Sequence, residues 1–108
     1  MIFYFGMDKS FYDVPFSSKL DKLWGDGAKY LEVGEVSEAE KCFIKALAIN
    51  PKHPFLMNNL ACVREYQGRL FEAEKLYREA LELAEKEITI TGNLARIMHK
   101  AGKTDECR

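Results

Sequence analysis

Apolar residues recur along this chain with the spacing of amphipathic α-helices. One stripe has members at i, i+3, i+4, i+7 and i+8, namely Ala39, Cys42, Phe43, Ala46 and Leu47. A second stripe of similar spacing runs through residues 73–84. Between the stripes the pattern is interrupted at Gly or Pro, which end helices or form turns. The pattern predicts five helices, at about 19–33, 37–50, 54–67, 71–86 and 88–101.

Local sequences indicate where three of these helices begin. Ser18 with Asp21, and Ser37 with Glu40, have the spacing of a capping box, which predicts helix starts near 19 and 38. Pro54 is placed for the first turn of a helix, where its missing N–H has no intrahelical partner to lose.

Several residue classes repeat with one period. Gly34, Gly68 and Gly102 are each 34 residues apart, and each is expected to end a helix in the left-handed conformation that begins a turn. Small residues recur with the same step where two helices would cross, at Gly27, Ala61 and Ala95 and at Ala39, Ala46, Ala73 and Ala80. Large side chains are predicted to fill the space around them, namely Tyr30, Phe43, Leu60, Leu76 and Tyr77.

These repeats carry a resemblance to a known family. The first unit has Leu23, Asp26, Gly27, Tyr30, Ala39, Phe43 and Pro51; the second has Met57, Leu60, Ala61, Arg64, Ala73 and Tyr77, with Glu85 where proline is expected. Over about residues 20–108 the chain resembles the tetratricopeptide repeat (TPR) family. The resemblance implies an all-α, right-handed α-solenoid of antiparallel helix pairs with about five helices. It divides the chain into an aromatic N-terminal arm (1–18) and a TPR domain (19–108), with repeats at about 20–53 and 54–87 and a partial repeat at 88–108.

Besides Glu85, the sequence departs from the TPR pattern at three places. Asp26 replaces an apolar core residue, and Arg64 replaces the expected tyrosine. The third pair lacks its second helix, so the fifth helix either caps the array or leaves an apolar face for another molecule.

The TPR resemblance also implies a site, because the first helix of each pair lines a concave groove that binds a partner. Phe55, Asn59, Cys62 and Tyr66 fall on one stripe, at i, i+4, i+7 and i+11. The predicted groove residues are Trp24, Phe55, Asn58, Asn59, Cys62, Tyr66, Asn93, Arg96 and Lys100.

Two pairs within this set have an alternative role. Asn59 and Asn93 are one repeat apart and either contact a peptide backbone or fix contacts between helices. Trp24 and Phe55 either line the groove or belong to the core.

The composition of the 108 residues limits the class of partner. Charged residues make up 31%, hydrophobic residues 47%, and the net charge is −1, as in a soluble globular protein without an electrostatic footprint for nucleic acid. No apolar stretch is long enough to cross a membrane, and the apolar start lacks the features of a signal peptide. Three cysteines without metal-binding spacing, Cys42, Cys62 and Cys107, indicate reduced thiols and a cytoplasmic protein.

No constellation of residues indicates catalysis. His53 and His99 have no Cys, Ser or acidic partner at a suitable spacing, and no metal or cofactor motif is present. We therefore predict a non-enzymatic adaptor or scaffold, without cofactor or metal, that binds an extended peptide or short helix of another protein. The alternative is a structural unit that self-assembles, for example as a homodimer, through the N-terminal arm or the incomplete third repeat.

The first sixteen residues hold six of the aromatic side chains, Phe3, Tyr4, Phe5, Phe11, Tyr12 and Phe16. Gly6 and Pro15 disfavour one long helix there. Three arrangements are open: the segment caps the apolar edge of the first repeat, lies in the groove of its own or a neighbouring chain, or stays loose.

Overall fold

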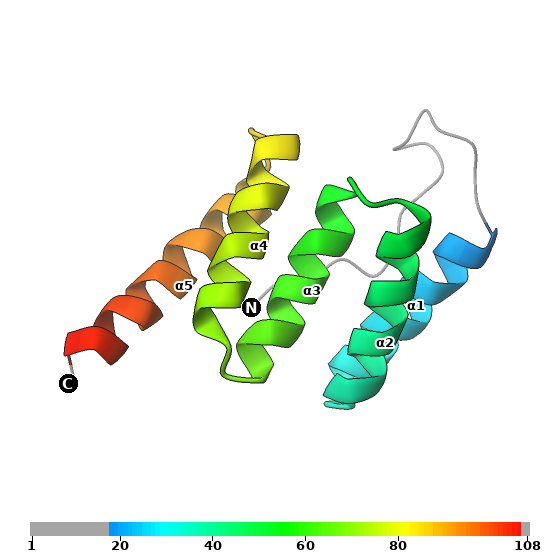
Figure 1. Cartoon of the computed structure of the whole chain (residues 1–108), viewed down its shortest axis with the longest axis horizontal. Helices are drawn as coiled ribbons and strands as arrows, with labels where there is room; N and C mark the ends of the chain where they lie inside the picture. Colours follow the sequence, from blue (N-terminus) through cyan, green and yellow to red (C-terminus); the bar gives the residue numbers. More distant parts are fainter. Residues whose placement is uncertain (1–17, 107–108) are drawn as a thin grey trace.

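The computed structural model describes residues 18–106, which form five helices and no strand (Figure 1). The helices are α1 (Ser18–Glu32), α2 (Val36–Ile49), α3 (Pro54–Tyr66), α4 (Leu70–Leu83) and α5 (Ile88–Glu106). Each helix packs against the next one in sequence, and α1 also contacts α3. In the view of Figure 1, α1 lies partly behind α2 and α5 partly behind α4. The predicted all-α solenoid of helix pairs is confirmed. Apart from Ser18, the predicted arm lies outside the described residues.

The turns inside the first two pairs have the same structure. Gly34 and Gly68 have φ angles of +84° and +78°, a region that glycine enters without steric cost. The N–H of Glu35 donates to the Tyr30 carbonyl at 2.8 Å, and the N–H of Arg69 donates to the Arg64 carbonyl at 2.9 Å. These bonds from C″ to C3 define the Schellman motif, so two of the three repeated glycines end helices as predicted.

The third repeated glycine does not form a turn. Gly102 lies inside α5, which continues to Glu106, so the prediction that this helix ends near residue 101 is wrong. A glycine permits the left-handed conformation but does not impose it. Within the described residues no sixth helix packs beside α5, and the equivalent small residue Ala95 is exposed. Helical hydrogen bonding therefore continues through Gly102.

Capping also differs from the prediction at α2. This helix begins at Val36, and its N-cap residue Glu35 makes no side-chain capping bond, so Ser37 is not an N-cap. At α3 the N-cap is His53, whose Nδ1 accepts the N–H of Leu56 at 3.2 Å, with Pro54 in the first turn as predicted. The sequence pattern did not predict His53 as an N-cap because histidine is not one of the usual capping residues.

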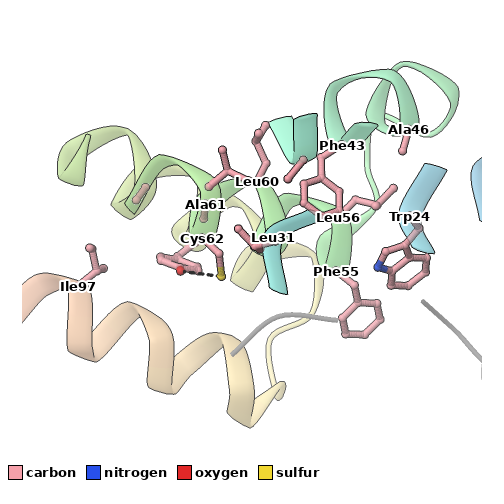
Figure 2. Close-up of a cluster of buried hydrophobic side chains, with 14 residues drawn as sticks. Trp24, Leu31, Phe43, Ala46, Phe55, Leu56, Leu60, Ala61, Cys62 and Ile97 are labelled. Atoms are coloured by element: carbon pink, nitrogen blue, oxygen red, sulfur yellow. Dashed lines mark hydrogen bonds between the residues drawn. The ribbon is translucent and has the colours of Figure 1, made fainter. Parts of the chain in front are cut away.

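The core follows the predicted alternation of small and large residues. A Cβ atom added to Gly27 would lie 2.6 Å from Cε1 of Phe43, so only glycine fits at this crossing. The four predicted alanines of α2 and α4 are fully buried, as are Phe43 and Tyr77. Figure 2 shows Phe43 and Ala46 within the buried cluster. Leu60 is buried and Leu76 packs at the edge of the cluster. Tyr30 is 39% exposed in the last turn of α1, so its assignment to the core is wrong.

Arg64, which replaces the expected tyrosine, links three helices instead of filling the core. Its guanidinium pairs with Glu40 of α2, and its Nε lies 3.5 Å from Glu72 of α4. The hydrogen bond from Arg64 keeps the pKa of Glu40 below its usual range although burial opposes this. A polar bridge therefore stands where the family pattern has a tyrosine, and in the first repeat that tyrosine, Tyr30, is itself 39% exposed.

Candidate functional site

All nine predicted site residues lie on the first helices of the pairs, α1, α3 and α5. We call the surface that these helices form, opposite α2 and α4, the first-helix face. The structure separates its residues into two groups. An aromatic group lies at the junction of α1 with α3, and a polar group lies at the junction of α3 with α5.

The aromatic group is centred on His53. Its ring lies edge-on to Trp24, with centroids 4.7 Å apart, and edge-on to Phe55 at 6.0 Å. Trp24 and Phe55 are 2% and 6% exposed and lie at the same end of the buried cluster (Figure 2). Burial lowers the pKa of His53 to about 4, so the ring is neutral at pH 7 and its Nδ1 remains an acceptor. Both aromatic site residues therefore pack with the core.

The polar group is centred on Glu65, a residue absent from the predicted site. Its side chain is 2% exposed and receives hydrogen bonds from two cations of α5. Arg96 donates to both carboxylate oxygens, with Nη2 at 2.9 Å from Oε1, and Lys100 Nζ lies 2.9 Å from Oε2. Burial raises the pKa of Glu65, but the bonds from Arg96 and Lys100 outweigh it, and the net pKa is below the usual value. Glu65 is therefore ionised at neutral pH.

Tyr77 of α4 extends this group to a third helix. Its hydroxyl donates to Oε1 of Glu65 at 3.1 Å and lies 3.2 Å from Sγ of Cys62, the contact dashed in Figure 2. Burial raises the pKa of both groups, that of Cys62 to about 12. The Cys62 thiol therefore stays protonated and is a poor nucleophile. The chain from Cys62 through Tyr77 and Glu65 to Arg96 connects α3, α4 and α5.

A pair of buried asparagines also joins α5 to α3. Asn93 Nδ2 donates to Asn58 Oδ1 at 2.9 Å, and Asn58 Nδ2 lies 3.5 Å from Asn59 Oδ1. The repeat register relates Asn93 to Asn59, yet its amide bonds to the preceding residue, Asn58. This geometry corresponds to the role in fixing helices, one of the two roles that the sequence left open for these amides.

The accessible part of the site lies toward the ends of α3 and α5. Tyr66 is 53% exposed although it continues the stripe of Phe55, Asn59 and Cys62, all of which are buried. The side chains of Arg96 and Lys100 are 33% and 49% exposed while they contact Glu65. These three residues are the parts of the predicted site that solvent reaches.

The repeat register contained a signal for Glu65 that the sequence reading did not use. Arg96 is the 34-residue equivalent of Cys62, and Lys100 is the equivalent of Tyr66. On α3, Glu65 lies close to the positions of Cys62 and Tyr66. When α5 packs beside α3, this acidic residue therefore meets the two basic residues of α5. Placing each first helix beside its repeat equivalent predicts this contact.

Across residues 18–106, no group of three or more His, Cys, Asp or Glu is placed to hold a metal ion. Among the helices of this same part of the chain, none combines the length and apolar character that a membrane crossing needs.

Comparison with known proteins identifies the family. No significant match is found among curated proteins. A family profile described as "Tetratricopeptide repeat" matches residues 27–86, which is more than half of the chain and includes the first two glycine turns. With its helix pairs and 34-residue period, this chain belongs to the tetratricopeptide repeat family.

Proposed function

We propose that this chain is a non-enzymatic adaptor or scaffold that binds an extended peptide or short helix of another protein on the first-helix face. TPR repeats are generally protein–protein interaction modules. The observation that carries the proposal is the arrangement of Tyr66, Arg96 and Lys100. The exposed ring of Tyr66 directly follows Glu65 in the last turn of α3, and the two partly exposed cations of α5 contact that same Glu65.

The charges on this face favour an acidic partner segment. Arg96 and Lys100 place two positive charges at the carboxylate of Glu65, and their side chains remain 33% and 49% exposed. The aromatic ring of Tyr66 supplies apolar contact area with little side-chain entropy to lose. A partner with an apolar side chain near an Asp or Glu would therefore use both features.

Selection from a displayed peptide library tests this function directly. Peptides selected on the full chain are measured against Tyr66→Ala, and Phe71→Ala of α4 is the matched control because it removes an aromatic ring that is 65% exposed. We expect Tyr66→Ala to weaken binding about tenfold, which is about 1.4 kcal/mol, and the control to bind normally. Equal binding by both variants, with both folded, would place the site elsewhere.

A second function is favoured by the outer side of α5. Ala95 is exposed and Met98 is 44% exposed, whereas Gly27 and Ala61, the repeat equivalents of Ala95, are buried. Beside them, an open groove between α4 and α5 is lined by two apolar and three charged residues, namely Leu81, Leu94, Arg78, Glu82 and Glu85. The alternative proposal is self-assembly through this side. Sedimentation equilibrium tests it: a mass that rises with concentration and falls with Leu94→Glu supports self-assembly, and a monomer at all concentrations contradicts it.

A further inference from the structure

The first-helix face is buried more completely than the second helices explain. Trp24, Ala28 and Leu31 of α1 are 2%, 0% and 1% exposed. At 100° per residue they lie about 40–100° around the helix axis from Gly27, the residue that faces Phe43 of α2. On α3, Phe55 lies about 120° from Ala61, the equivalent of Gly27, by the same rotation. His53 and the contact between α1 and α3 cover part of this surface, and packing by α2 and α4 does not account for the rest.

Burial along this stripe of α3 ends before the helix does. Phe55 and Asn59 are at most 6% exposed, and Tyr66 on the same stripe is 53% exposed. Cys62 lies between them and contacts Tyr77 of α4. A short segment that lay on the α1 end of the face would cover the first turns of α3 and leave Tyr66 in its last turn exposed.

We propose that residues 1–17 of the same chain occupy the first-helix face over α1 and the first turns of α3, in competition with a partner protein. The inference rests on the proposed function, because it concerns the regulation of that same face. The segment ends where α1 begins, so it is attached at the edge of the surface that it would cover. It carries Phe3, Tyr4, Phe5, Phe11, Tyr12 and Phe16, apolar rings that favour a buried position.

The segment is long enough for this position. Residues 1–17 span at most about 56 Å when extended. The 13 residues of α3 are about 20 Å long at 1.5 Å per residue. Neighbouring helices are separated by about 8–10 Å. A chain that starts at α1 therefore reaches α3 and runs along it, and its effective concentration there is on the order of millimolar.

The chemistry of the face suits such a segment. Trp24, Leu31 and Phe55 provide apolar contact for the aromatic rings of the segment. A partner would bind only to molecules in which the segment is displaced, so its apparent affinity falls in proportion to the open fraction.

Photo-crosslinking in the full chain tests the position of the segment. Phe5 is replaced by p-benzoylphenylalanine, and the linked peptides are identified by mass spectrometry. We expect links within one chain to α1 or to the first turns of α3. Links between two chains, with a mass that depends on concentration, would assign the face to a second copy and overturn the proposal. Links only to α4 or to the outer side of α5 would overturn it as well.

A truncation that starts at Ser18 tests the same point with an internal probe, because Trp24 is the single tryptophan of the chain. We expect its emission to shift to the red and its quenching by acrylamide to increase at least twofold. A synthetic peptide of residues 1–17 should reverse both changes, and a control peptide with Phe3, Tyr4 and Phe5 replaced by Ser should not. Unchanged quenching in a truncated chain that keeps its helical circular dichroism would sink the proposal.

A truncated chain that unfolds still permits a test in the full chain. There, replacing Phe3, Tyr4 and Phe5 by Ser should raise Trp24 quenching while helicity is retained, and unchanged quenching overturns the proposal. The two proposals fail separately. Library peptides that bind full and truncated chains equally, and still need Tyr66, leave the binding function in place and remove the competition. Loss of the Tyr66 dependence alone removes the binding function and leaves the crosslinks as they are.

Discussion

The two junctions between successive first helices occupy equivalent positions in the repeat but differ in chemistry. Trp24, Ala28 and Leu31 of α1 are succeeded, 34 residues later, by Asn58, Cys62 and Glu65 of α3. The α1–α3 junction is consequently aromatic, with His53 between Trp24 and Phe55, and the α3–α5 junction is polar, with paired amides and a shared carboxylate.

The difference shows that repeat geometry fixes where side chains meet but not how they hold the helices together. An apolar junction is non-directional and tolerates small shifts of the helices. A buried polar junction stabilises only when every group has a partner with good geometry. With the same backbone arrangement, the stability of the aromatic junction therefore depends on buried side-chain volume. The stability of the polar junction depends on hydrogen-bond and charge partners.

The largest effect is expected at the aromatic junction. Trp24→Ala removes the largest buried ring of α1 and should lower the free energy of unfolding by about 3–5 kcal/mol. Urea denaturation followed by circular dichroism measures the change, and Tyr66→Ala is the control, expected within about 0.5 kcal/mol because the ring is exposed. Similar losses in both variants would show that Trp24 is not part of the core.

At the polar junction, Glu65→Gln should lower stability by about 2–4 kcal/mol. The amide cannot accept from Arg96, Lys100 and Tyr77 together, and two cations would lose their shared counter-charge. The matched control is Glu74→Gln, which removes a surface ion pair with Arg78 and should cost at most about 0.5–1 kcal/mol. Chemical denaturation of both variants gives the comparison, and equal costs would contradict a special role for Glu65.

The sequence predicted the parts of this comparison that depend on local pattern. Period, helix pairing and the small residues at crossings follow from the spacing of apolar and small residues alone, as the tight Gly27–Phe43 contact illustrates. The partner of Asn93, the importance of Glu65 and the cap at His53 did not follow. Each depends on the rotation of a helix or on a partner more than 30 residues away, or on a side chain that seldom acts as a cap.

Acid should affect the two junctions in different pH ranges. His53 has a folded pKa of about 4, below the usual 6.5, so the unfolded chain binds more protons between these values. Stability should therefore fall as the pH drops from 6.5 to 4, by about 2–3 kcal/mol in total. The pKa of Glu65 is also lowered, so its contribution is lost only below the usual Glu value. Melting temperatures recorded from pH 7 to 3 measure both ranges.

The variant His53→Asn separates the two contributions. Asparagine is a strong N-cap residue that does not titrate, so the decline between pH 6.5 and 4.5 should be absent while the decline at lower pH remains. A decline in the upper range that is as steep as in the original chain would assign the effect to another group.

The smallest net effect is expected when both members of the amide pair are replaced. Asn93→Leu alone leaves Asn58 buried without this donor and should cost about 1–3 kcal/mol. Adding Asn58→Leu removes the carbonyl oxygen that has lost this donor and should recover part of that loss. A double-mutant cycle from urea denaturation gives the coupling free energy. Strictly additive losses would show that the two amides do not act as a pair.

The Cys62 side chain also supplies a kinetic measurement of the polar junction. Its thiol is buried and protonated, so a thiol reagent modifies it only during transient openings of α3 from α4 and α5. In a chain where the other cysteines are replaced by serine, the labelling rate divided by that of a free thiol gives the population of the open form under native conditions. The labelling rate of one buried sulfur atom thus measures local opening, at temperatures and pH values where the chain as a whole remains folded.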